Sequence, residues 1–147
     1  MRKTIAVLFL CVLFFTVGCD KNSNQKEVTS ELLGVSMYTE KSQYPSNVSK
    51  INVVWKNDTD KELTFGDSYF IHKLVGQEWK AIGNDKVVFN SIGYIVSPHS
   101  EVKHSYNIRV YTDKLEEGTY QIITDFLDVH SPGNYDTYNL TTSFTVE

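Results

Sequence analysis

The sequence predicts an all-β fold, an antiparallel β-sandwich, over residues 32–147, and two observations support this prediction. The first is a hydrophobic period of two: Ile51, Val53 and Trp55 lie at every second position, and residues 140–146 repeat the pattern. Such alternation is typical of antiparallel strands with one buried face. The second is a series of turn-forming clusters, which hold all three prolines. Short strands separated by frequent turns indicate a sandwich.

The individual strands follow from these runs and from the turns between them. Valine, isoleucine, threonine and tyrosine, which strands favour, are common in the runs. No helical period stands out in the same region. Turn clusters lie at residues 45–47, 56–60, 66–68, 83–85, 97–100, 116–118 and 131–134. We therefore expect strands at residues 33–40, 49–56, 61–65, 69–75, 78–82, 86–89, 92–96, 101–111, 119–128 and 137–146.

One turn makes the predicted sandwich immunoglobulin-like. Residues 115–120 read LEEGTY, so Tyr120 follows a glycine turn at the start of a strongly alternating strand. This is the sequence context of a tyrosine corner, in which the hydroxyl bonds back to upstream backbone. A plain buried strand tyrosine is the alternative. The cysteine–tryptophan–cysteine spacing of antibody domains is absent from the sequence, so packing alone must hold the core.

The first residues have the composition of a secretory signal. Two basic residues precede an apolar run at residues 5–17, and Gly18 and Cys19 follow. A membrane-spanning helix needs roughly 20 apolar residues, so this run is short for a permanent anchor. A basic start, an apolar centre and a small residue at the cut describe a signal peptide. We expect residues 1–18 to be that peptide.

Residues 16–19, Thr-Val-Gly-Cys, resemble the bacterial lipobox, in which a small residue precedes a cysteine that becomes lipid-modified and N-terminal. Thr16 stands where that motif usually has leucine. The resemblance implies a diacylglyceryl group, with palmitate-type chains, on Cys19. Two acyl chains hold a protein stably at a membrane. Lipidation also explains the single cysteine left after removal of Cys11 with the signal. An ordinary signal peptide that ends near a cysteine is the alternative.

Residues 19–31 are expected to form a flexible polar tether, and residues 32–147 to form one domain. The sequence DKNSNQKEVTSE at residues 20–31 has a single apolar residue, too few to offset the entropy of ordering. The chain has 14 basic and 18 acidic residues, and two of the basic ones lie in residues 1–18, which leaves a net charge of −6. This charge argues against binding to nucleic acid or anionic lipid, which recognise clustered lysine and arginine.

A distinctive segment, NDTDKELTFG, occupies residues 57–66 and is followed by Tyr69. With GVSMY before it and EWK and LEEGTY after it, this segment resembles a bacterial immunoglobulin-like domain family of small lipoproteins, mainly from Gram-positive bacteria. The similarity covers about residues 33–146, with Pro98-His99 where the family more often has Pro-Gly. It implies an immunoglobulin-like sandwich tethered by lipid to the outer face of the cell membrane. It implies no activity, because a fold alone does not give function.

No motif for catalysis or metal binding is present in the sequence. A zinc site needs at least three converging ligands, and the four histidines are scattered, at His72, His99, His104 and His130. Residues 125–136 hold three aspartates and His130 but lack calcium-loop spacing, so solvated strand ends are the preferred interpretation. A nucleophile elbow, a P-loop and a dinucleotide fingerprint are all absent from the sequence. We expect no enzyme activity, metal or cofactor.

The connection between the last two predicted strands is the better candidate for function. Residues 129–136 take the place of the F–G loop of an immunoglobulin domain, and loops on a rigid scaffold often bind partners. His130, Tyr135 and Tyr138 lie in or beside it, and tyrosine supplies contact area at low entropic cost. We expect a binding or accessory module for a protein or a cell-wall glycan. A plain hairpin loop whose tyrosines cover the end of the sandwich is the alternative.

A second resemblance leaves another function open. Residues 57–65, the hairpin at Trp79 and residues 115–120 also resemble the small all-β intracellular proteinase inhibitors of bacilli-like bacteria. That family is cytosolic, whereas the apolar N-terminus here predicts export. An exported relative would act on envelope proteases. A purely structural spacer is a third possibility, without a distinguishing feature in the sequence.

Overall fold

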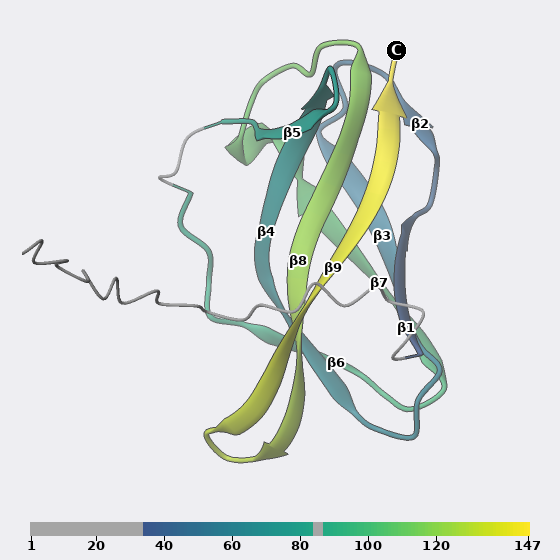
Figure 1. The fold of residues 1–147 in the computed structure, drawn as a ribbon, viewed down its shortest axis with the longest axis vertical. Helices are drawn as coiled ribbons and strands as arrows, with labels where there is room; N and C mark the ends of the chain where they lie inside the picture. Colours follow the sequence, from purple (N-terminus) through teal and green to yellow (C-terminus); the bar gives the residue numbers. More distant parts are fainter. Residues whose placement is uncertain (1–33, 84–86) are drawn as a thin grey trace, which may run out of the picture.

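The computed structural model describes residues 34–83 and 87–147, which form a sandwich of two β-sheets (Figure 1). The all-β prediction is therefore confirmed. The expected signal peptide and the tether with Cys19, in residues 1–31, lie outside the described residues. Among the residues that are described, no helix is long and apolar enough to cross a membrane.

Each sheet combines strands from distant parts of the sequence. The smaller sheet has the order β1 (Val35–Thr39), β3 (Lys50–Asn57) and β7 (Ser100–Asn107). The larger sheet has the order β2 (Gln43–Tyr44), β9 (Asn134–Val146), β8 (Gly118–Ser131), β4 (Leu63–Val75) and β5 (Glu78–Ala81), and β6 (Gly93–Val96) also pairs with β4. All pairs are antiparallel except β2 with β9. The chain therefore crosses from one sheet to the other between β1 and β2.

The inward side chains of both sheets form one core rich in aromatic rings. Trp55 on β3 stacks on Phe65 of β4, with ring centroids 4.4 Å and planes 15° apart. Phe126 on β8 meets Trp55 edge-on at 6.4 Å. Every second residue of β8 from Tyr120 to Asp128 is buried, as the period of two predicts. Burying each large apolar side chain stabilises the fold by roughly 1.5–3 kcal/mol, so this shared core holds the two sheets together.

Two strands that the sequence predicts separately, at residues 61–65 and 69–75, form the single strand β4. Its pairing with β8 shifts in register between Phe65 and Tyr69. The turn-forming residues 66–68 therefore occupy an irregularity of the strand and do not end it. An irregularity of this kind bends a strand while the chain continues in the same sheet. The predicted turn at this position is wrong for that reason.

Other predicted strands differ at their ends. The prediction at residues 86–89 is wrong in its described part, because residues 87–89 form no strand. The strand predicted at residues 101–111 ends early, at Asn107. The Asn107 side chain accepts a 3.1 Å hydrogen bond from the N–H of Arg109 and begins a 3₁₀ turn there. The two-residue strand β2 was not predicted, because so short a run shows no period.

The connection predicted as a loop at residues 129–136 is the end of a long hairpin. β8 continues to Ser131 and β9 begins at Asn134, so two residues, Pro132 and Gly133, join them. Gly133 has φ +77°, a left-handed value that glycine adopts without strain. Figure 1 shows this hairpin extending past the end of the sandwich. The sequence shows no alternation here because side chains on both faces of the projecting hairpin are exposed, so burial does not sort polar from apolar residues between the faces.

Tyr120 makes the contact that defines a tyrosine corner. Its ring is buried, and its hydroxyl donates a 2.8 Å hydrogen bond to the carbonyl of Glu116. The ring also stacks on Phe144 of β9, with centroids 5.4 Å apart. A hydroxyl bonded to backbone a few residues upstream is the geometry expected of this motif. The contact fixes the turn through which the chain enters β8.

His104, a partly buried histidine beside the core, is expected to make the stability of the fold depend on pH. His104 on β7 is surrounded by the rings of Phe65, Tyr94 and Tyr106. Burial lowers the pKa of His104, a shift that Asp67 at 3.5 Å partly opposes. With a pKa lowered by folding, the native state binds fewer protons than the unfolded state. Above the ordinary pKa of histidine, His104 therefore does not affect stability. As the pH drops below that value and through the lower folded-state pKa, the unfolded state takes up the proton more readily, and the free energy of unfolding falls.

We expect a His104→Gln variant to lose less stability than the wild type between about pH 7.5 and pH 5, because it has no buried imidazole to protonate. Thermal unfolding at a series of pH values measures this difference. The His99→Gln variant controls for the loss of a histidine, since His99 is exposed and contacts Asp60 at 2.8 Å. If the melting temperatures of the His104→Gln variant and the wild type fell in parallel as the pH dropped, protonation of His104 would not be the cause of the loss of stability in acid.

Candidate functional site

Asn57, at the end of β3, organises the turn that leads into β4. Its side chain is fully buried, and its amide nitrogen donates to the carbonyls of Lys61 at 2.7 Å, Val96 at 3.1 Å and Ser97 at 3.1 Å. Its side-chain oxygen accepts hydrogen bonds from Thr59, from the backbone N–H at 2.9 Å and from the hydroxyl at 2.7 Å. These contacts fix the positions at which the turn presents Thr59 and Lys61.

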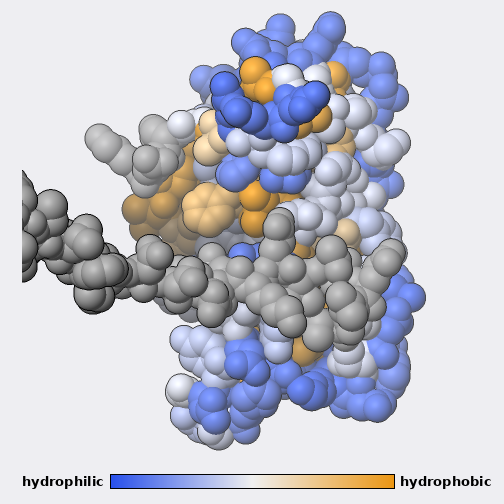
Figure 2. Space-filling model, in the orientation of Figure 1, coloured by the Kyte–Doolittle hydropathy of each residue, from blue (hydrophilic) through white to orange (hydrophobic). Residues whose placement is uncertain are grey.

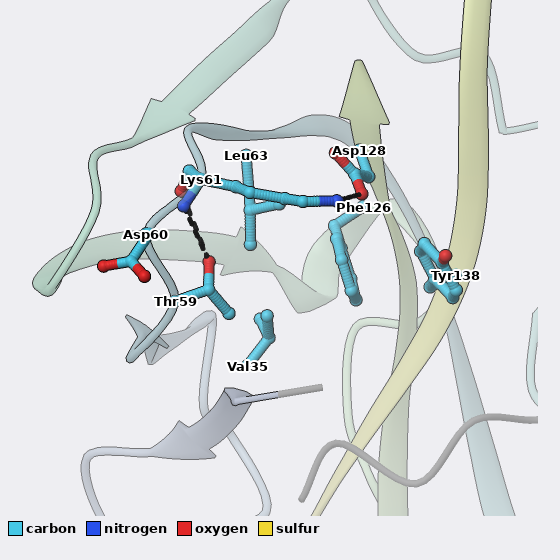
Figure 3. Close-up of a pocket in the computed structure, with 8 residues that line it drawn as sticks. All are labelled: Val35, Thr59, Asp60, Lys61, Leu63, Phe126, Asp128 and Tyr138. Carbon is cyan, nitrogen blue, oxygen red and sulfur yellow. Dashed lines mark hydrogen bonds and ion pairs between the residues drawn. The ribbon is translucent and has the colours of Figure 1, made fainter. Parts of the chain in front are cut away.

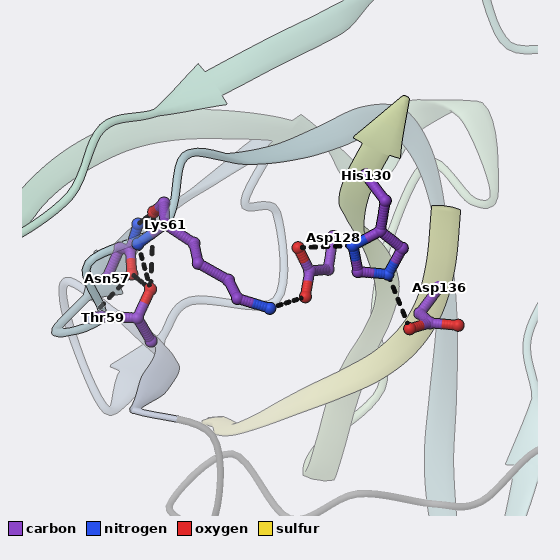
Figure 4. Close-up of polar contacts among 6 residues, drawn as sticks. All are labelled: Asn57, Thr59, Lys61, Asp128, His130 and Asp136. Carbon is purple, nitrogen blue, oxygen red and sulfur yellow. Dashed lines mark hydrogen bonds and ion pairs between the residues drawn. The ribbon is translucent and has the colours of Figure 1, made fainter. Parts of the chain in front are cut away.

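Lys61 reaches from this turn across to β8 (Figure 4). Its Nζ lies 2.5 Å from Oδ2 of Asp128, whose side chain is largely buried, whereas that of Lys61 is mostly exposed. The hydrogen bond and the negative charge of Asp128 raise the pKa of Lys61 above its ordinary value. The amine therefore stays protonated at neutral pH. The ion pair links the turn after β3 to the root of the β8–β9 hairpin.

His130 extends the same polar chain towards the tip of the hairpin (Figure 4). Its Nε2 lies 2.9 Å from Oδ2 of Asp136, and its Nδ1 lies 4.0 Å from Oδ1 of Asp128. Asp128 and Asp136 are partners in the register of the hairpin, one on each strand. The imidazole therefore lies between two carboxylates. These three residues belong to the acidic segment that the sequence singled out, and the structure adds Lys61 to them.

A pocket lies beside the Lys61–Asp128 pair and encloses about 330 Å³ (Figure 3). We name it the hairpin-root pocket. Buried side chains of three strands form its apolar floor: Val35 on β1, Leu63 on β4 and Phe126 on β8. Tyr138 on β9 stacks on Phe126, with centroids 5.1 Å apart, and forms an aromatic wall. The rim is polar and consists of Thr59, Asp60, Lys61 and Asp128.

The structure separates the three residues predicted for binding. Tyr138 lines the hairpin-root pocket, and His130 adjoins it through Asp128. Tyr135 lies on the opposite face of the hairpin, because successive side chains of a strand alternate between its faces. There Tyr135 pairs with Val129, and it is 52% exposed. The structure therefore brings His130 and Tyr138 together at the hairpin-root pocket and places Tyr135 apart from them.

Sequence reasoning missed the contribution of Thr59 and Lys61 to the site. Lys61 is 67 positions from Asp128 in the chain, so no local pattern joins them. A usable signal was nevertheless present in NDTDK at residues 57–61, where an asparagine ends a buried strand and a threonine follows two residues later. Asparagine in this position often hydrogen-bonds the backbone two residues on and fixes a turn.

The hairpin-root pocket has the composition of a ligand pocket. Lys61 donates a hydrogen bond to Asp128, and this pairing raises the pKa of the lysine above its ordinary value. Within residues 34–83 and 87–147, no group of three His, Cys, Asp or Glu side chains is placed to hold a metal ion. An apolar hollow with a few polar groups at its rim is the usual composition of a ligand pocket.

A second apolar area lies near β4 and β5. Figure 2 shows it as an orange region on this face of the molecule, beside largely hydrophilic surface. Phe70, Val87 and Phe89 help to line a hollow here, which encloses about 50 Å³. Its lining includes no charged side chain. The volume of this hollow is smaller than that of the hairpin-root pocket, and its lining has no charged group to orient a ligand. We therefore place the candidate site at the hairpin root.

Comparison with protein families and curated sequences gives one match. A family model described as "Bacterial Ig-like domain" matches residues 31–145. The match spans nearly all of the described sandwich, including the hairpin and the turn at Asn57. No curated protein sequence matches the chain significantly.

Three solved structures with low sequence identity align with the chain. The archaellum periplasmic stator protein FlaG from Sulfolobus acidocaldarius aligns over 76% of this chain and 98% of its own, with 11% identity and a TM-score of 0.37. The ASH/PapD-like domain 7 of human CEP192 aligns over 78% and 86%, with 14% identity and a TM-score of 0.38. A β-glucosidase from Listeria innocua aligns over 74% of this chain and 16% of its own, with 10% identity and a TM-score of 0.32. At these TM-scores none of the three supports an argument about function.

Proposed function

Since this chain belongs to the bacterial Ig-like domain family, we propose that it is a non-catalytic binding or accessory module of the bacterial cell envelope. We propose the hairpin-root pocket as its binding site. Sandwich domains of this kind present binding groups on a rigid scaffold. In this chain the projecting hairpin and the turn fixed by Asn57 are the two segments that carry the side chains of the pocket rim, at one end of the fold.

The observation that carries this proposal is a preformed hollow whose floor is apolar. Val35, Leu63 and Phe126 belong to the hydrophobic core, yet they also line a space of about 330 Å³. Tyr138 adds a flat aromatic surface, and tyrosine is enriched where proteins bind partners. Paired charges at the rim can orient a ligand without repelling a neutral one. A pocket with these properties is suited to hold part of a ligand.

We expect a Tyr138→Ala variant to bind isolated cell envelopes about tenfold more weakly than the wild type, because truncating a central aromatic contact usually costs more than 1 kcal/mol. Sedimentation of the chain with envelopes of its source bacterium measures this, using a Cys19→Ser background to keep lipid out of the assay. The matched control is Tyr135→Ala, which removes the same side chain from the same strand on the opposite face. That variant should bind like the wild type.

Two results would overturn the assignment of the site. One is equal binding by the Tyr138→Ala variant and the wild type. The other is a loss of binding of the same size in the Tyr135→Ala variant. Circular dichroism and the melting temperature of each variant separate a loss of the contact from a loss of the fold.

We further propose that the chain is held at the extracytoplasmic face of the cell membrane by a lipid on Cys19. The lipobox-like residues 16–19 and the apolar run before them support this location. The net charge of −6 after residues 1–18 disfavours adsorption to anionic lipids, so a covalent anchor is the more effective attachment. The polar residues 20–31 would then separate the domain from the lipid surface.

Inhibition of an envelope protease is the second candidate function, and one observation favours it. The β8–β9 hairpin extends past the sandwich and ends in a turn of two residues, a narrow shape that fits a cleft (Figure 1). Titration of the secreted protease activity of the source bacterium with the purified chain tests this candidate. Stoichiometric loss of activity would support it, and full activity at saturating chain would exclude it for those proteases.

A further inference from the structure

The face of the larger sheet that is turned away from the smaller sheet carries apolar side chains. Buried residues of β4 and β8 alternate with Phe70, Ile123 and Leu127, which therefore point away from the core. Phe70 pairs with Ile123, and Thr64 lies between Leu127 and Ile95 of β6. Phe70 and Ile95 are 57% and 55% exposed. We call these five residues the outer apolar area, and Figure 1 shows the larger sheet from their side.

The corresponding face of the smaller sheet is mostly polar. On that face Lys56 lies between Ser36 and Glu101, and Asn52 lies beside Ser105. A sheet face that meets only water normally has such a composition. The outer apolar area departs from it, and contiguous exposed apolar surface on a soluble domain usually marks an interaction site.

Asp125 brings a carboxylate into the outer apolar area. It lies between Ile123 and Leu127 on β8 and pairs with the uncharged Asn139 on β9. Among the described residues, no side chain forms a hydrogen bond or ion pair with the Asp125 carboxylate, and partial burial raises the pKa of this group above its ordinary value. A positive charge that approached Asp125 would favour its ionised form. The area therefore has a site for a cation among apolar side chains.

Two glycines next to Asp125 leave room for a long side chain. Residues 66–68 form the irregularity of β4 opposite Asp125, because the regular pairing stops at Phe65 and resumes at Tyr69. Gly66 pairs with Gly93 of β6. A Cβ atom placed on Gly66 would lie no closer than 3.7 Å to another heavy atom, so the surface above this residue is open. Neither glycine has a side chain to keep a partner away from the backbone.

We propose that a partner protein docks on the outer apolar area and places the side chain of a lysine or arginine over Gly66, with its charge on Asp125. The methylene stem of such a side chain packs on apolar surface while its charged end remains at a polar group. Apolar residues of the partner would cover Phe70 and Ile95. This inference goes beyond the proposed function, because it assigns a second surface that is separate from the hairpin-root pocket.

The charges favour a different protein over a second copy of the chain. In a twofold dimer the same surface meets itself. Two Asp125 carboxylates would then leave water without a cation from the outer apolar area of either copy, and burying an unpaired charge is costly. Each copy also has a net charge of −6 after residues 1–18. Anionic lipids attract clustered lysine and arginine, which this area lacks, so a membrane is not the expected occupant either.

A small cation tests the site without knowledge of the partner. The probe is n-butylguanidinium, which reproduces the stem and charged end of arginine, and the target is the mature chain with Cys19→Ser, labelled with nitrogen-15. We expect millimolar probe to shift the amide signals of Gly66, Gly93 and Asp125. The shifts should vanish in Asp125→Asn and persist in Glu101→Gln, a variant on the opposite outer face. n-Butanesulfonate, with the same stem and a negative charge, should cause no such shifts.

Photo-cross-linking in the source bacterium tests the partner. Thr141 is exposed and pairs with Ile123, so p-benzoylphenylalanine in place of Thr141 should capture one protein. The same group at Ser105, on the smaller sheet, should not capture that protein. The purified partner should bind Asp125→Asn and Phe70→Ser at least about tenfold more weakly than the wild type, since breaking a desolvated charge pair costs at least that much. Asp125→Lys should abolish binding, and glutamate in place of the contacting lysine or arginine of the partner should restore it.

Several results would overturn the inference. Equal shifts with both probes, no shifts at Gly66 and Asp125, no captured protein, or a captured protein whose binding does not depend on Asp125 would each do so. Dimerisation that depends on Phe70 in sedimentation equilibrium would identify a second copy as the occupant. Binding to phosphatidylcholine vesicles that depends on Phe70 would identify a membrane.

The two surfaces of the chain can fail independently. The Tyr138→Ala variant should still give the cross-link from Thr141, and the effect of Tyr138→Ala on sedimentation with envelopes should persist in an Asp125→Asn background. Loss of the cross-link in Tyr138→Ala would show that the partner occupies the hairpin-root pocket, which overturns the second surface and leaves the proposed function intact.

Discussion

Replacing Asn57 with alanine is expected to lower the free energy of unfolding by about 3 kcal/mol, because buried polar groups lose their partners. The carbonyl of Val96 accepts from the Asn57 amide in the interior, and the carbonyls of Lys61 and Ser97 accept from the same group. The substitution also removes the acceptor for Thr59. Urea unfolding monitored by circular dichroism measures the change, provided that the free energy of unfolding still depends linearly on the urea concentration.

Asn52 provides a matched control on the same strand. Its side chain is exposed and bonds to Glu40 at 2.8 Å, so Asn52→Ala should cost less than about 1 kcal/mol. An Asn57→Asp variant keeps the shape of the side chain but loses its donors, and it should be destabilised at least as much as Asn57→Ala. If the two alanine variants were equally stable, Asn57 would not organise the turn that presents Lys61.

Trp55→Ala is expected to destabilise the domain by about 4 kcal/mol, within the range measured for truncation of buried aromatic residues. Trp55 is 1% exposed, stacks on Phe65 and contacts the edge of Phe126. Its indole N–H also donates to the hydroxyl of Tyr106 at 3.3 Å, which would be left without that donor. Domains of this size are stable by about 5–15 kcal/mol, so the loss is a large share of the total.

The second tryptophan of the chain is the natural control. Trp79 lies on the edge strand β5 and is 39% exposed, so Trp79→Ala should cost no more than about 1 kcal/mol. Thermal unfolding followed by circular dichroism compares the two variants without depending on tryptophan fluorescence. Equal melting temperatures for the two variants would contradict the placement of Trp55 at the centre of the core.

The fold was predictable where the core imposes a period of two. In β8 the buried residues from Tyr120 to Asp128 alternate as the sequence indicates, because each faces the opposite sheet. Prediction failed where local signals conflict with tertiary context. Residues 66–68 have the composition of a turn, yet pairing with β8 on either side keeps β4 continuous. Asn107 caps a 3₁₀ turn, which shortens a strand whose alternation continues in the sequence.

The site was predictable only in part, because it combines distant segments. His130 and Tyr138 lie in the segment where function was expected, and the structure brings both to the hairpin root. Tyr135 was grouped with them since neither the hairpin turn nor the face of each strand was known. Lys61 and Val35 reach the same place from other strands, which only the pairing of the sheets determines. A single sequence does not specify that pairing.

The central proposal is that the chain is an exported binding domain held at the membrane by lipid, and the mass and cellular fraction of the native protein test this proposal most directly. We expect a chain that begins at Cys19, carries the added mass of a diacylglyceryl lipid and sediments with membranes. The Cys19→Ser variant should lose the lipid mass and leave the membrane fraction. A native chain that retains residues 1–18, carries no lipid and is soluble in the cytosol would contradict the claim.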